Sequence, residues 1–138
     1  MPTPLTLPQI NALMTHTLGE TLGIEITTCE EGHVEATMPV DARTHQPAGL
    51  LHGGATVALA ETVASIGGWM LVYAEGKAVV GIEINANHLR SVRSGTVKAS
   101  GTVLHRGKTT QVWEIRIHDQ ANRLIAISRC TLAVVDIR

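Results

Sequence analysis

The sequence contains no phenylalanine, and aromatic residues make up only 2% of its 138 residues. Proteins that bind single-stranded nucleic acid commonly stack bases on aromatic rings, so this scarcity argues against a nucleic-acid partner. Only two cysteines, Cys29 and Cys130, are present, which is too few for a disulfide scaffold. The first thirty residues also lack the basic start and apolar core of a secretory signal. We therefore expect a cytoplasmic protein with free thiols.

Several motifs of well-understood chemistry are absent as well. The sequence has no HExxH or CxxC spacing, and His88, His105 and His118 fall in separate predicted strands, so we expect no metal site. Neither the GxSxG motif of serine hydrolases nor the phosphate-binding P-loop motif occurs. We expect no redox cofactor either.

The composition is that of one globular domain over residues 1–138, since 44% of residues are hydrophobic and 17% are charged. The charges are unevenly distributed. Residues 1–76 hold one basic and eight acidic residues, a net charge of −7, whereas residues 77–138 hold ten basic and four acidic residues, a net charge of +6. The second half could face an anionic, phosphate-bearing ligand, although exposed strands often carry arginine and lysine without any ligand.

The first half of the chain predicts one helix and one hairpin. Thr6 followed three residues later by Gln9 forms a capping box, and apolar residues then recur at helical spacing as far as Gly19 or Gly23. Residues 24–29 and 33–38 alternate apolar with polar on either side of a glycine turn, which is typical of a β-hairpin.

Residues 50–74 are apolar on nearly every side of a helix-length run, which indicates a buried helix. Glu61 near its middle and the lack of basic flanks disfavour a membrane span. Residues 79–90, 96–105, 110–118 and 124–135 then alternate as four strands, which we expect in meander order. These elements predict an α+β fold in which a curled antiparallel sheet surrounds one long helix, and so short a chain is expected to dimerise.

Glu61 is the first candidate for chemistry, because an unpaired carboxylate within an apolar helix is costly. Ser65 lies one turn further along on the same face. Together they could serve a general base or a carboxylate nucleophile. A structural glutamate that pairs with an arginine across an interface is an equally reasonable interpretation.

The second candidate is the entry to the same helix at His52, Gly53 and Gly54, where backbone N–H groups could stabilise an oxyanion. A glycine pair used only for close packing is the alternative. About 12 Å of helix rise separates Gly53 from Glu61, so two chains of an antiparallel dimer would have to share each site. Gln46, in the preceding loop, could hold the carbonyl or a water molecule.

Residues 88–93 and 105–110 are two basic segments at predicted strand ends. Arginine and lysine beside serine, threonine and glycine can bind phosphate oxygens, and their number suits a nucleotide-like diphosphate better than a nucleic acid. Both segments could equally be solvated turns.

Residues 35–65, followed by residues 79–88, strongly resemble the hotdog-fold acyl-CoA thioesterases, within the branch that acts on dihydroxynaphthoyl-CoA and on siderophore precursors. The resemblance implies a thioester hydrolase, with an aroyl-CoA thioester as the expected substrate, that assembles from homodimers into a homotetramer. It implies that Glu61 attacks the carbonyl or activates water, that the Gly53 amide polarises the carbonyl, and that Gln46, His52 and Ser65 orient thioester and water. It also implies coenzyme A contacts, some across the dimer interface, at Gly81, His88, Leu89, Arg90, Ser91, His105, Arg106, Gly107, Lys108, Thr109 and Thr110.

Two other functions remain open at this point. A hotdog hydratase or dehydratase would share proton transfer between a histidine and an acid, whereas a non-catalytic acyl-CoA binding protein would bind without releasing thiol. The sequence also leaves open the acyl group and whether the thiol is coenzyme A or an acyl carrier protein.

Overall fold

In the computed structural model, which describes residues 5–137, two short helices replace the single predicted N-terminal helix: α1 (Leu7–Ala12) and α2 (Leu18–Leu22). The capping box is confirmed, because the Thr6 backbone N–H donates to Gln9 Oε1 at 2.8 Å and the Gln9 N–H donates to Thr6 Oγ1 at 3.3 Å. The single helix was wrong because His16 has a φ of 64°, which a right-handed helix cannot accommodate.

The remaining elements follow the predicted order. The hairpin consists of β1 (Glu25–Glu30) and β2 (His33–Pro39). Next come the helix α3 (Gly53–Val72), a 3-10 turn η1 (Tyr73–Glu75), and the strands β3 (Lys77–His88), β4 (Thr96–Arg106), β5 (Thr110–His118) and β6 (Leu124–Asp136). The single domain predicted over residues 1–138 includes residues 1–4 and 138, which lie outside the described residues.

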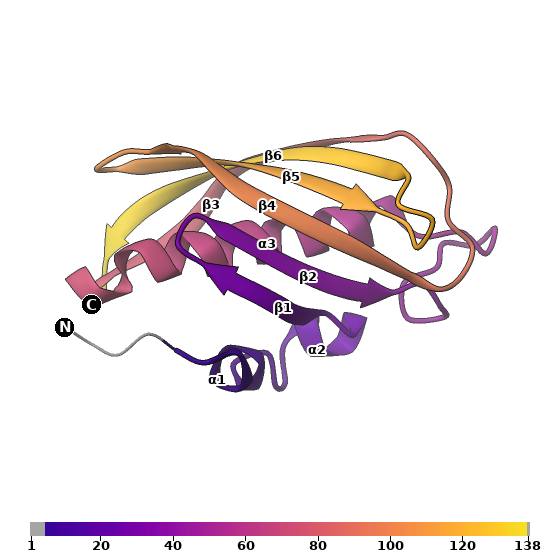
Figure 1. Ribbon diagram of the computed structural model, residues 1–138, viewed down its shortest axis with the longest axis horizontal. Helices are drawn as coiled ribbons and strands as arrows, with labels where there is room; N and C mark the ends of the chain where they lie inside the picture. Colours follow the sequence, from indigo (N-terminus) through magenta and orange to yellow (C-terminus); the bar gives the residue numbers. More distant parts are fainter. Residues whose placement is uncertain (1–4, 138) are drawn as a thin grey trace.

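All six strands form one antiparallel sheet in the order β1-β2-β4-β5-β6-β3. The predicted meander is therefore wrong at its first strand, because β3 pairs with β6 at the edge of the sheet while β4 lies next to β2. Residues 89–95 connect β3 to β4. Seven residues can span about 23 Å, which is enough to cover the roughly 14 Å between these two strands in the sheet. Figure 1 shows this connection and the curl of the sheet.

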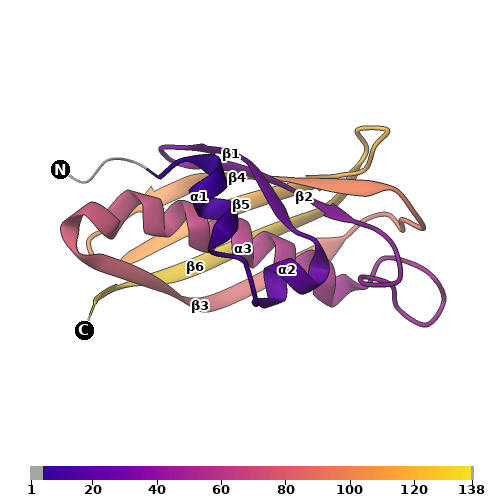
Figure 2. The same cartoon turned by 90° about the horizontal axis from the view of Figure 1, so that it is seen from below.

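The helix α3 lies across the concave side of the sheet, as Figure 2 shows from below. Its buried residues include Leu59, Ala60 and Val63, which belong to the same core as the fully buried Trp113 of β5. Gly67 makes room for that tryptophan, since a Cβ on Gly67 would lie within 3.0 Å of three ring atoms. The prediction of a curled sheet around one buried helix is confirmed.

Within the described residues, one segment, Gly53–Glu75, is apolar and long enough to cross a membrane by length and composition. In the structure it packs against the sheet, and 56% of its most apolar stretch is buried inside the protein. The segment is the core helix of the fold.

Candidate active site

The first turn of α3 is organised by His52. This residue has extended backbone angles and caps the helix, because its Nδ1 accepts a 2.7 Å hydrogen bond from the Gly54 N–H. In the neutral ring the proton is then on Nε2, and the side chain is exposed. As the first residue of the helix, Gly53 has a backbone N–H with no acceptor inside α3. This turn offers a backbone donor next to an imidazole donor.

Gln46 lies in the loop that leads to this turn. Its side-chain Oε1 accepts from the Ala48 N–H, so its NH2 group remains as a donor. The loop is closed by the Gln46 N–H, which donates to the Leu50 carbonyl oxygen at 2.8 Å. It is anchored by buried Thr44, whose hydroxyl donates to the Pro39 carbonyl oxygen at 2.7 Å. The amide of Gln46 is thus held by local hydrogen bonds.

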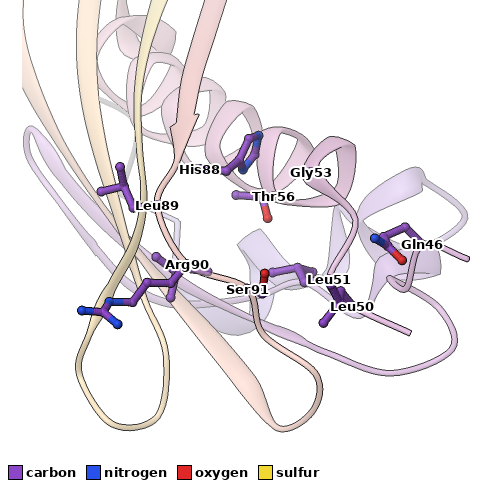
Figure 3. A pocket seen from close by; sticks show the side chains of 10 residues that line it. Gln46, Leu50, Leu51, Gly53, Thr56, His88, Leu89, Arg90 and Ser91 are labelled. Atoms are coloured by element: carbon purple, nitrogen blue, oxygen red, sulfur yellow. The ribbon is translucent and has the colours of Figure 1, made fainter. Parts of the chain in front are cut away.

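A pocket of about 340 Å³ lies beside this turn. It brings six of the predicted catalytic or coenzyme A positions together at one end of β3 and β6. Its lining residues are Gln46, Leu50, Leu51, Gly53, Thr56, His88, Leu89, Arg90, Ser91 and Ile125. Figure 3 shows the His88 ring next to Thr56 and close to Gly53, whereas the Arg90 side chain points away from them. His88 lies very close to the backbone of Gly53, since a Cβ on Gly53 would lie 3.1 Å from His88 Nε2.

The Glu61 and Ser65 side chains do not line this pocket. Both are half-buried on α3, and Glu61 faces β3 at Gly81, where a Cβ would lie 3.5 Å from the Glu61 carboxyl carbon. The eight residues from Gly53 to Glu61 correspond to about 12 Å of helix rise. Within a single chain, the Glu61 carboxylate is therefore too far from the N-terminal turn of α3 to act on the same carbonyl, as the spacing predicts.

The segment from His105 to Thr110 lies at the opposite end of the sheet from His88. It forms the turn between β4 and β5, beside the C-terminal end of α3. The guanidinium of Arg106 is engaged there, because Nη2 donates to the Leu71 carbonyl oxygen at 2.8 Å and Nη1 to Glu31 at 3.3 Å. A single chain thus does not bring the two basic segments together.

Sequence reasoning missed part of the pocket. Thr56 is buried and lines it, and Ile125 contributes from the start of β6. Thr56 could have been found, because it follows Gly53 by three residues and so shares its helix face. Ile125 could not, because only the pairing of β3 with β6 brings it to the site.

Two titratable groups near the site have displaced pKa values. Burial, with the carboxylates of Glu61 and Glu83, raises the pKa of the Cys130 thiol to about 11. Hydrogen bonds from Arg43 lower the pKa of Asp41, in the loop before Gln46, to about 2. Residues 5–137 contain no group of three or more histidine, cysteine, aspartate or glutamate side chains that could hold a metal ion.

The chain is similar to several known proteins. A model of the thioesterase superfamily matches residues 48–126. The chain is 50% identical over 131 residues to the proofreading thioesterase EntH of Klebsiella pneumoniae, covering 95% of both chains. It is 50% identical over 117 residues to the 1,4-dihydroxy-2-naphthoyl-CoA hydrolase of Listeria monocytogenes, covering 85% of this chain and 94% of that protein. A crystal structure of a thioesterase from Haemophilus influenzae, 50% identical, has a TM-score of 0.93 and covers 97% of this chain and 93% of that chain.

The curled sheet around a single helix is the hotdog fold, and the protein is a thioester hydrolase of that fold. The chain belongs to the thioesterase superfamily. The predicted fold class, resemblance and enzyme class are confirmed, whereas the roles of individual residues stay predictions.

Proposed function

We propose that this thioesterase hydrolyses an aroyl-CoA thioester to the free acid and coenzyme A, at a site shared by two copies of the chain. The observation that carries the proposal is the backbone N–H of Gly53, which lies in a pocket lined by Gln46 and His88. The aroyl-CoA class is supported by the Listeria relative, whose name specifies such a substrate. An acyl carrier protein thioester presents the same carbonyl and is the alternative thiol.

In this mechanism the thioester oxygen accepts from the Gly53 N–H at the N-terminal end of α3. The helix dipole favours the negative charge that develops on that oxygen as the carbonyl carbon becomes tetrahedral. The NH2 group of Gln46, whose oxygen is already engaged with the Ala48 N–H, can donate to the carbonyl or to a water molecule. His52 can donate from Nε2, because its Nδ1 is the helix cap.

Glu61 of the second copy supplies the attack, and Ser65 orients the reacting groups. The carboxylate either takes a proton from water as the water oxygen bonds to the carbonyl carbon, or bonds to that carbon itself before water releases the acid. In both routes the carbon–sulfur bond breaks, and the thiolate of coenzyme A leaves and takes up a proton. After a single turnover in oxygen-18 water, label in the Glu61 carboxylate would identify the covalent route, because it arises only when water attacks the Glu61 carbonyl of the mixed anhydride.

The edge of the sheet at β3 supports the dimer. Val80 and Ile82 on this edge strand are 53% and 59% exposed, and an edge strand has hydrogen-bonding groups available for another strand. If two copies pair antiparallel through β3 about an axis between Ile84 and Asn85, Gly81 of one lies opposite His88 of the other. Glu61 of one copy then faces the Gly53 turn of the other.

The same pairing would bring the two basic segments to one end of the dimer. Antiparallel β3 strands place residues 88–91 of one copy at the same end as residues 105–110 of the other. This arrangement supports a coenzyme A site that crosses the interface. The outer face of each sheet remains available for two dimers to join into a homotetramer, which sedimentation analysis would measure directly.

The role of the Gly53 N–H is tested by Gly53→Pro, which removes that donor. Proline suits the first position of a helix, and the extended angles of His52 are compatible with a following proline. Gly53→Ala is the matched control, because it adds a Cβ near His88 but keeps the N–H. We expect Gly53→Pro to lower kcat about 100- to 1000-fold, as loss of an oxyanion donor does elsewhere, while Gly53→Ala retains most of the activity.

The substrates for this assay are benzoyl-, dihydroxynaphthoyl- and straight-chain CoA thioesters, with release of free thiol as the readout. Glu61→Gln should abolish turnover while the protein stays folded. Equal rates in wild type and Glu61→Gln would refute the mechanism, and preference for straight chains would refute the aroyl class.

The shared site is tested by mixing two inactive variants. Refolding Glu61→Gln with Gly53→Pro at equal concentrations should restore about a quarter of wild-type activity, because half the dimers are mixed and each mixed dimer has one intact site. No recovery, with mixed dimers demonstrated by differential tags, would place both residues in one chain.

A cytoplasmic location is part of the proposal. It is supported by the two free cysteines, Cys29 and Cys130, which suit a reducing compartment. Fractionation of cells that make the native protein would test it.

A further inference from the structure

The Glu61 carboxylate occupies the space in which a side chain at position 81 would lie. A Cβ built on Gly81 would lie less than 3.0 Å from Glu61 Oε2. It would lie 3.5 Å from the carboxyl carbon of the same side chain. Real Cβ atoms essentially never approach another atom so closely, so either the carboxylate or the strand would have to move.

The backbone of Gly81 does not itself require glycine. The glycines of this protein with positive φ are Gly23, Gly32, Gly49, Gly76 and Gly95, and Gly81 is not among those described. An L-amino acid could therefore adopt its conformation, and the space taken by Glu61 is what restricts the residue.

A β-bulge turns Gly81 and His88 toward the same helix. The pairing of β3 with β6 shifts between Gly81, opposite Leu132, and Glu83, opposite Thr131, so that Ile82 is an extra residue. Residues seven apart lie on opposite faces of a regular strand, because side chains alternate. The bulge thus lets β3 contact α3 at both Glu61 and Gly53. Leu132 and Ala126, the β6 residues opposite Gly81 and His88, are buried, which confirms that both positions face the helix.

We propose that Gly81 is a positioning residue that leaves room for the Glu61 carboxylate in its reactive orientation. The inference rests on the proposed role of Glu61 in the hydrolysis. It assigns Gly81 an effect on kcat, in place of the coenzyme A contact that the family resemblance implies for this position.

The test is Gly81→Ala, assayed for thiol release from benzoyl-CoA and for inhibition by coenzyme A. Since displacement of a reacting group by about 1 Å can cost a factor of about 100, we expect kcat to fall about 100-fold. KM and the inhibition constant of coenzyme A should stay within about twofold, since no contact with the substrate is removed. Ala133→Ser is the control, because it adds one atom on the neighbouring strand β6, away from α3.

A second substitution distinguishes positioning from general damage to the fold. Glu61→Asp withdraws the carboxylate by one methylene, so it should lower kcat in the wild type but raise kcat in the Gly81→Ala background. The proposal would be overturned if the two substitutions lowered kcat independently, so that their effects multiplied in the double variant. It would also be overturned if Gly81→Ala left kcat unchanged and weakened inhibition by coenzyme A.

Thermal unfolding gives a readout that does not depend on catalysis. Gly81→Ala should lower the melting temperature in the wild type, but not in Glu61→Ala, where the space is empty. An equal loss in both backgrounds would overturn the proposal even if the single variant is too unstable to assay. Full activity of Glu61→Gln would instead overturn the proposed hydrolytic role of Glu61, and the two failures are therefore distinguishable.

Discussion

The side-chain amide of Gln111 donates a 3.2 Å hydrogen bond from Nε2 to the backbone carbonyl oxygen of Gly68, which joins strand β5 to helix α3. Its Oε1 accepts a 2.9 Å hydrogen bond from Nε1 of Trp113. Both side chains are fully buried. The amide thus satisfies the indole N–H while it fixes the position of the helix along the sheet.

Replacing Gln111 with leucine should destabilise the protein by about 1–3 kcal/mol, because the buried Trp113 N–H would lose its acceptor. Urea unfolding followed by tryptophan fluorescence measures this change. Gln120→Leu, in the exposed turn between β5 and β6, is the matched control and should change stability far less. Equal effects of the two substitutions would show that the buried amide is not needed.

The sequence was informative about elements but not about how strands pair. Periodicity located all six strands and α3, because half-buried strands alternate and a fully enclosed helix is apolar on every side. The position of β3 beside β6 depends on contacts between residues about fifty apart, which no local pattern records. The bulge at Ile82 is hidden for the same reason, since extra residues are recognised only against a partner strand.

The candidate site divides in a similar way. Gly53 and His52 could be predicted, because a glycine at the start of an apolar helix has a local meaning. The contact of Gly81 with Glu61 could not be derived from spacing, since it joins two elements of different periodicity. That His88 and the turn after His105 lie at opposite ends of the sheet likewise follows only from the strand order.

Two substitutions of His52 should separate capping from chemistry. His52→Ala removes the cap and should cost about 1 kcal/mol of stability, whereas His52→Asn can still accept from the Gly54 N–H. We expect both variants to lose turnover, because each lacks the Nε2 donor, but only the alanine variant to unfold at lower temperature. Normal turnover in His52→Asn would show that the residue acts only as a helix cap.

The ion pair between Asp41 and Arg43 predicts a pH dependence of stability. Arg43 Nη2 lies 2.7 Å from Asp41 Oδ2, and its hydrogen bonds lower the carboxyl pKa from 3.8 to about 2 in the folded protein. A carboxyl group whose pKa is lower in the folded state stabilises the protein when the pH is above the pKa of the unfolded chain. This contribution is lost as the pH falls from about 4 to about 2.

Asp41→Asn should therefore be less stable than the wild type at pH 5, and most of the difference should be lost by pH 2. Urea midpoints at pH 5, 3 and 2 measure it, and the comparison isolates Asp41 because the other carboxyl groups titrate in both proteins. A difference that stays constant over this range would mean that the pair does not perturb the carboxyl group.

The thiol of Cys130 reports on the position of Glu61. Burial and the negative charges of Glu61 and Glu83 raise its pKa to about 11, so the native thiol should stay protonated and unreactive at pH 8. In a Cys29→Ser background, which leaves Cys130 as the one thiol, a thiol reagent at pH 8 should react only after unfolding in urea, whereas the native thiol should react only at higher pH, where it ionises.

Adding Glu61→Gln to this background removes one of the charges that raise the Cys130 pKa. The pKa should then fall, and reaction of the native protein with a small methanethiosulfonate should begin at lower pH than in the parent. Glu75→Gln, at the exposed end of the helical segment, is the charge-matched control and should leave the pH profile unchanged. If both substitutions gave the parent profile, the Glu61 carboxylate could not lie beside β3 and β6, and the space at Gly81 would have to serve another group.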